Sequence, residues 1–230
     1  MKTYTTTGKT DGFGSQYQAI MAGIAYCFYM KYQYIHTPIK TIRGSTKECD
    51  ELNKFIGIDY ENSKNKVDIN EAYPTIVHYS NKPDIYYTKD VLNYIRKCYN
   101  STDKPMVEYP DIAIHIRRGD VKKGMNDRYT NNNIYNVIIE KLIALYPNYK
   151  ISIYSEGKLE DFHDIQNNNI KIILNQSICQ DFHSLVKAKV LVTAKSSFSY
   201  SAALLNENTV YYIDFWHKKL NHWIHIQKLL

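Results

Sequence analysis

The sequence of 230 residues lacks the features that mark membrane and secreted proteins. It contains no run of the ~20 apolar residues that a membrane-spanning helix needs. Its opening segment, MKTYTTTGKTDG, lacks the apolar core of a signal peptide. We therefore expect a cytoplasmic protein with no membrane span.

Cysteine is scarce, and its spacing argues against two further kinds of site. The four cysteines, Cys27, Cys49, Cys98 and Cys179, lie far apart, and no two of them form a C-x-x-C pair. This pattern indicates neither a zinc site nor a disulfide framework. We expect reduced thiols, which agrees with a cytoplasmic location.

The excess of positive over negative charge is also small. The chain carries 29 Lys and Arg against 23 Asp and Glu, a formal net charge of +6, and the basic residues are scattered along it. This excess suits a phosphate-bearing ligand or a nucleic acid without deciding between them. No recognised nucleic-acid-binding motif is present, so we expect no nucleic-acid partner. The chain has 22 tyrosines. A composition bias of the genome is the favoured explanation of this number, and a stacking surface for sugars or bases is the alternative.

The pattern of the chain changes near its middle. The first half predicts helices over residues 17–34, 49–56 and 86–99 and strands over residues 34–37 and 75–79. The polar stretch 101–105 ends in proline and predicts a linker. We therefore expect two domains, over residues 1–104 and 105–230.

The second half alternates apolar strands with helical patterns. The expected strands are residues 111–117, 150–154, 170–174, 190–193 and 210–213, and the expected helices are residues 131–146, 181–188, 197–205 and 216–230. Such alternation is typical of an α/β fold, a parallel sheet with helices packed on it. Two asparagine runs, 131–133 and 167–169, are expected to be short solvated loops.

Ligands of open parallel sheets bind beyond the carboxyl ends of the strands, and one such end is strongly polar. It reads His115-Ile-Arg117-Arg118-Gly-Asp120. Two adjacent arginines cannot both enter the core, and a guanidinium matches a phosphate as a rigid two-pronged donor. The alternative is a surface arginine pair held by Asp120, with His115 satisfied in the core.

Two further segments carry polar residues close to expected helix starts. The run Thr193-Ala-Lys-Ser196-Ser197 joins a strand to a helix, where hydroxyls cap the helix and backbone N–H groups attract anions. Plain capping is the alternative interpretation. Asp181 precedes His183 by two residues, and for Asp181 the alternative is the N-cap of its own helix.

Together these segments resemble the superfamily of α-1,6-, α-1,2- and protein O-fucosyltransferases. The H-x-R-R-x-D run matches the first motif of that family, and residues 181–197 resemble its second and third motifs. Gly12-x-Gly14-Ser-Gln resembles its N-terminal glycine loop. The stretch that ends at Glu156 resembles the strand between the first and second motifs.

The resemblance implies a GT-B-like fold of two Rossmann-type domains: a reduced N-terminal acceptor-side domain over residues 1–104 and a nucleotide-sugar-binding domain over residues 105–230. It implies an inverting, metal-independent transfer of fucose from GDP-fucose to a glycan hydroxyl, with no cofactor. By the same resemblance, guanine contacts His115 and Asp181, and the β-phosphate contacts Arg117 and Ser197. The residues expected to bind the donor are Gly12, Gly14, His115, Arg117, Arg118, Glu156, Asp181, Ser196 and Ser197.

A missing motif agrees with metal-free chemistry. Metal-dependent glycosyltransferases generally hold a divalent ion with an Asp-x-Asp run, and the nearest match here is Asp59-Tyr60-Glu61. We expect Arg117 and the serine turn to stabilise the leaving diphosphate instead.

The catalytic base stays open. Where α-1,6 enzymes carry a glutamate, ten positions after the motif histidine, this chain has Met125. The candidates are Asp120, Asp127 and Glu156, and we expect Arg117, Asp120 and Asp127 to be the catalytic residues. Asp120 has the alternative role of orienting an arginine.

Two other functions remain open from the sequence. One is an inverting glycosyltransferase with a different nucleotide-sugar donor, and the other is a non-catalytic basic binding protein. The abundance of Asn, Lys, Ile and Tyr indicates an A/T-rich genome, so we expect a bacterial or viral protein that acts in the host cytosol.

Overall fold

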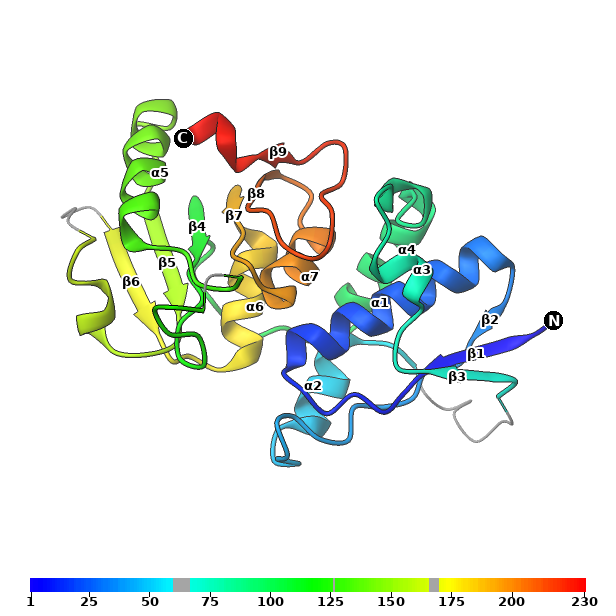
Figure 1. Cartoon of the computed structure of the whole chain (residues 1–230). Helices are drawn as coiled ribbons and strands as arrows, with labels where there is room; N and C mark the ends of the chain where they lie inside the picture. The colour runs from blue at the N-terminus through cyan, green and yellow to red at the C-terminus, as the bar shows by residue number, and fades with distance from the viewer. Residues whose placement is uncertain (60–66, 126, 166–169) are drawn as a thin grey trace. The chain divides into compact units, whose positions relative to one another are not determined.

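The computed structural model describes residues 1–59, 67–125, 127–165 and 170–230 (Figure 1). The chain forms two compact units, Met1–Pro105 and Met106–Leu230. The Tyr60-Glu61 part of the acidic run considered above and the asparagine run 167–169 lie outside the described residues.

The first unit is built on a small parallel sheet. Its strands are β1 (Thr3–Thr6), β2 (Gln33–Tyr34) and β3 (Ile69–Glu71), in the order β2-β1-β3. Its helices are α1 (Phe13–Met30), α2 (Cys49–Ile56), α3 (Thr75–His78) and α4 (Lys89–Asn100), with a 3₁₀ turn η2 (Pro83–Ile85). The largely buried helix α1 connects β1 to β2, as parallel pairing requires. In the described part of the chain, no helix is long and apolar enough to cross a membrane.

The second unit is a six-stranded parallel sheet in the order β6-β5-β4-β7-β8-β9. Its strands are β4 (Ile112–His115), β5 (Ile151–Ser155), β6 (Ile170–Leu174), β7 (Val190–Val192), β8 (Thr209–Tyr212) and β9 (Ile224–His225). Its helices are α5 (Asn132–Leu145), α6 (Ile178–Lys187) and α7 (Ser197–Leu205), with 3₁₀ turns η3 (Leu159–Phe162) and η4 (Ile226–Leu229). This is the doubly wound order, in which the chain reverses direction across the sheet between β4 and β7.

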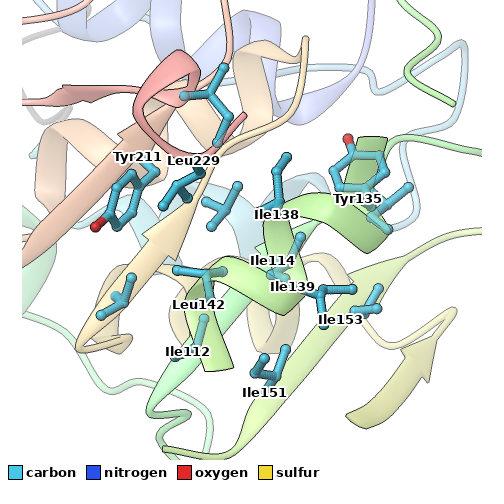
Figure 2. Close-up of a cluster of buried hydrophobic side chains, with 14 of the residues drawn as sticks. Ile112, Ile114, Tyr135, Ile138, Ile139, Leu142, Ile151, Ile153, Tyr211 and Leu229 are labelled. Atoms are coloured by element: carbon cyan, nitrogen blue, oxygen red, sulfur yellow. The ribbon is translucent and has the colours of Figure 1, made fainter. Parts of the chain in front are cut away.

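Helices cover both faces of this sheet, with α5 on one face and α6 and α7 on the other (Figure 1). The α5 face holds the main apolar core, where Ile112 and Ile114 of β4 pack with Ile138 and Leu142 of α5 (Figure 2). Because alternate strand residues point to opposite faces, His115 points to the α6 and α7 face. The α/β class with parallel sheets, expected from the sequence, is confirmed.

Three local expectations from the sequence are wrong. Residues 75–79 form the short helix α3 instead of a strand, because the N–H groups of Val77 and His78 donate to the Pro74 carbonyl. The tail from residue 216 contains only β9 and η4. The run 131–133 begins helix α5, with Asn131 as its N-cap and Asn132 buried, so it is not a solvated loop.

The tail is irregular because side chains satisfy its backbone. The Lys219 ammonium donates to the carbonyls of Leu220 and Trp223 at 3.3 and 3.1 Å. The Tyr212 hydroxyl donates to the His217 carbonyl. These bonds take the place of the helical ladder that the aromatic and apolar pattern predicts.

Gly57 provides a test of packing in the first unit. It ends α2 with φ of +69°, and a Cβ there would lie 2.0 Å from the Cys98 carbonyl oxygen. We predict that Gly57→Ala destabilises the protein by about 1–2 kcal/mol through the left-handed backbone and by a further ~1–3 kcal/mol through displaced backbone. Gly44→Ala is the matched control, because Gly44 has φ of +83° and open space around it. Equal losses in the free energy of unfolding for the two variants, measured by urea unfolding, would contradict the prediction of a clash at Gly57.

Candidate functional site

The best-supported site lies where the direction of the second sheet reverses. Arg117 follows β4, and Ser196 follows the neighbouring strand β7. The Arg117 Nη1 donates to the Ser196 Oγ at 3.2 Å, which joins the two strand ends directly. In open α/β sheets, the crevice at this reversal is where ligands bind.

Asp120 fixes the guanidinium of Arg117. The Nε and Nη2 atoms of Arg117 donate to the two carboxylate oxygens of Asp120 at 3.3 and 2.8 Å. The arginine side chain is 21% exposed, so the cation is oriented but remains partly open to solvent. Because both oxygens of Asp120 face the guanidinium, the geometry favours the orienting role of Asp120 over the role of a general base.

The start of α7 adds a second positive feature. The Ser196 Oγ caps the helix by accepting from the Phe198 N–H at 3.2 Å, and the Ser199 Oγ accepts from the Ala194 N–H at 3.0 Å. The N-terminal end of a helix carries a partial positive charge. Ser196 therefore serves both as a cap and as a contact of Arg117, which brings a cation and the positive end of a helix together. Ser197 is also buried there, with its Oγ 3.4 Å from the His217 Nε2.

His115 lies on the same face as α7. Its ring centroid is 5.5 Å from that of Phe198, and no described residue provides a hydrogen-bond partner for its buried Nδ1. Burial, with a smaller contribution from the Arg117 charge, lowers the pKa of His115 to about 3. The imidazole is therefore neutral at physiological pH.

Asp181 is a buried carboxyl group with an unsatisfied oxygen. It is only 9% exposed, and its Oδ1 has no hydrogen-bond partner among the described residues. Burial, and secondly the charge of Glu156, raise the pKa of Asp181 to about 7. The capping interpretation of Asp181 is wrong, because Ser177 caps α6 and forms a capping box with Gln180.

The Glu156 side chain lies close to Gly119, in the turn of the H-x-R-R-x-D run. Gly119 has φ of +73°, and a Cβ there would lie 2.7 Å from the Glu156 Oε2. The absence of a side chain at Gly119 therefore lets the carboxylate lie against the turn. Glu156 thus lies near both this turn and Asp181, whose pKa it raises.

Arg118 points away from this edge. It is buried, and its guanidinium donates to the carbonyls of Arg117 and Thr130 and to the Asn132 Oδ1, over the ring of Tyr129. These contacts hold the loop before α5, which argues against direct contact between Arg118 and a donor.

Three other candidate residues, Asp127, Gly12 and Gly14, belong to other segments of the chain. Asp127 is exposed, and its nearest charged contact is Arg128 at 3.8 Å. Gly12 is the N-cap of α1 and Gly14 is buried in that helix, so both belong to the first unit. Their roles stay predictions, as does the assignment of the two units to acceptor and donor.

The structure brings two further residues to the site, His217 and Phe198, which were not among the candidates predicted from the sequence. His217 contacts Ser197, and Phe198 packs against His115. A serine-led helix start after an apolar strand is the signal for Phe198, whereas no local pattern marks His217. Among the described residues, no group of three or more His, Cys, Asp or Glu could hold a metal ion.

Comparison with known proteins gives structural likenesses only. No family model and no curated protein matches the chain. The E. coli heptosyltransferase WaaC, solved with ADP-2-deoxy-2-fluoro heptose, shares 9% identity over 97% of this chain and 92% of WaaC, with a TM-score of 0.49. The α-1,6-fucosyltransferase NodZ, co-crystallised with GDP, shares 10% identity over 93% of this chain and 96% of NodZ, also with a TM-score of 0.49.

A plant enzyme is a third likeness. An Arabidopsis thaliana FUT1 mutant in complex with GDP shares 11% identity over 96% of this chain and 72% of FUT1, with a TM-score of 0.47. The α/β class therefore rests on the two parallel sheets of this chain itself.

The buried carboxyl group makes stability depend on pH. The pKa of Asp181 is raised in the folded state, so between about pH 4 and pH 7 the folded carboxyl keeps a proton that the unfolded one loses, and stability falls as pH rises. We predict that Asp181→Asn is more stable than the parent chain at pH 8, by up to about 4 kcal/mol, with little difference at pH 4. Urea unfolding at both pH values measures this, with Asp127→Asn at an exposed carboxylate as the control. An equal difference at the two pH values would contradict the prediction.

Proposed function

We propose that this chain is an inverting, metal-independent glycosyltransferase that transfers fucose from GDP-fucose to a hydroxyl of a glycan. The observation that carries the proposal is the hydrogen bond between Arg117 and Ser196 at the reversal point of the second sheet. It places a fixed cation beside the positive end of a helix, which is the chemistry that a diphosphate requires.

The arrangement suits a diphosphate as leaving group. As the bond between the anomeric carbon and the β-phosphate oxygen breaks, negative charge grows on that oxygen. Arg117 is held in place by Asp120, so its free donor capacity is oriented before the reaction begins. Donors that are fixed in advance stabilise the transition state more than the ground state, and they replace the divalent ion of metal-dependent enzymes.

His115 and Asp181 support a guanine base. Guanine presents two adjacent N–H donors, and the buried Asp181 Oδ1 is an acceptor that lacks a donor. Burying such an acceptor is unfavourable until a ligand satisfies it. The His115 Nδ1 is likewise unsatisfied and neutral, so it accepts or donates according to its tautomer.

The transfer itself is a single displacement. The acceptor oxygen forms a bond to the anomeric carbon while the phosphate oxygen leaves, which inverts the configuration at that carbon. A carboxylate takes the proton of the acceptor hydroxyl. Since both oxygens of Asp120 face Arg117, we propose Glu156 or Asp127 for this role.

Arg117 is the direct test of the site. We predict that Arg117→Ala lowers kcat by about 10²–10³-fold, because one fixed donor to the developing charge is lost. Turnover of GDP-fucose with a glycan acceptor mixture measures this. Lys141→Ala is the control, because it removes a positive charge from an exposed position on helix α5. Full turnover in Arg117→Ala would show that the assigned role is wrong.

Donor and metal dependence are tested separately. We predict that GDP and GDP-fucose raise the Tm of the chain equally with and without EDTA, because side chains and a helix end replace the metal. A panel of UDP-, ADP- and GDP-sugars distinguishes the donor. Stabilisation by UDP-sugars alone would leave a glycosyltransferase with a different donor, and loss of all binding in EDTA would contradict the metal-free site.

A further inference from the structure

The first unit contains a cavity at the equivalent edge of its own sheet. The sheet order β2-β1-β3 also reverses direction, between β1 and β3, and ligands bind at such reversals. A cavity of about 400 Å³ lies there. It is lined by Thr6, Thr7, Gly8, Lys9 and Thr10 at the end of β1, by Gln16, Ala19 and Ile20 of α1, by residues 37–41, and by Asn70 and Ala72.

The lining is rich in hydrogen-bond donors, and none of the described residues that line the cavity carries a carboxylate. Lys9 and Lys40 are lining residues with ammonium groups, and Thr6, Thr7, Thr10, Thr37 and Thr41 are lining residues with hydroxyl groups. The Thr7 hydroxyl donates to the Asn70 Oδ1, which leaves the Asn70 Nδ2 as the donor end of that amide. The apolar side chains of Ile20 and Ile39 provide part of the wall.

Two contacts keep the rim of this cavity in place. The Gln16 Nε2 donates to the carbonyls of Asp11 and Thr41 at 2.7 Å each, which ties the loop after β1 to the loop after β2. The Lys9 ammonium lies 3.2 Å from the Asp11 carboxylate and 5.2 Å from the centre of the Tyr73 ring. Asp11 offsets one of the two ammonium charges, and within residues 1–59, 67–125, 127–165 and 170–230 no ion pair offsets the charge of Lys40.

We propose that this cavity binds an anionic sugar, with the carboxylate or phosphate of that sugar at Lys40 and Lys9. Ammonium groups and neutral hydrogen-bond donors both match the oxygens of a carboxylate or phosphate. The apolar wall accommodates the C–H face of a sugar ring. Resting on the proposed function, the ligand is the acceptor glycan, because the diphosphate chemistry belongs to the second unit. The acceptor is therefore an acidic glycan instead of a neutral one.

The test is an NMR titration of the full chain with D-glucuronate, glucose 6-phosphate and glucose. We expect the acidic sugars to shift the amide signals of Thr7, Thr10 and Thr41, and glucose at the same concentration to leave them in place. The tighter of the two acidic sugars identifies the acid group. Shifts from glucose equal to those from the acidic sugars, or no shifts from either acidic sugar, would overturn the proposal.

Substitutions of Lys40 test the same proposal at a single residue. Lys40→Gln is expected to raise the Kd of the acidic sugar about tenfold, the loss expected for a charge-assisted hydrogen bond. Lys40→Arg retains the charge and should retain binding, and Lys47→Gln removes a charge outside the lining. An unchanged Kd in Lys40→Gln would overturn the proposal.

The two proposals fail separately. GDP is titrated into the same sample, and its binding is followed at the amide of Ser197 in the second unit. Binding of GDP without binding of acidic sugars would remove only the acidic acceptor. Binding of acidic sugars without GDP would remove the proposed transfer and leave an anion-binding cavity.

Discussion

The hydrogen bond from Arg117 to Ser196 is the interaction on which the candidate site depends. It forms because the sheet places the ends of β4 and β7 side by side, although the two residues lie 79 positions apart in the sequence. The central strands that hold these ends are buried and apolar. The polar edge is thus positioned by a rigid scaffold and not by its own loops.

The side chains of the H-x-R-R-x-D run point to different faces of the sheet, because alternate residues of a strand do so. Ile112, Ile114 and Ile116 point to the α5 core, so His115 and Arg117 take the other face. Arg118 returns to the α5 side and holds the loop at Thr130. The two neighbouring arginines therefore differ in role. Arg117 lies at the candidate site, and Arg118 is buried and holds the loop before α5.

The regular elements of the second unit were predictable because their patterns are local. The strand 170–174 and the helix 197–205 coincide with β6 and α7, since an apolar run with polar flanks leaves few alternatives. The strand β1, of sequence TYTT, was missed because it is short and rich in threonine, and because only pairing with β2 and β3 makes it a strand.

The site was predictable in its components and not in their contacts. The sequence indicates that Arg117 and Ser196 each follow a strand, but only the order of the sheet brings them together. The inward turn of Arg118 and the approach of His217 to Ser197 depend on packing over long separations, for which a single sequence carries no signal. Likewise, the capping of α6 depends on Ser177, which lies before the expected start of that helix.

The unsatisfied carboxyl of Asp181 links occupancy of the site to proton balance. With its pKa raised to about 7, this carboxyl is about half protonated at neutral pH. A ligand that offers N–H donors prefers the ionised carboxylate, so its arrival expels that proton into the solvent. We therefore expect the affinity for such a ligand to rise from weakly acidic to weakly alkaline pH.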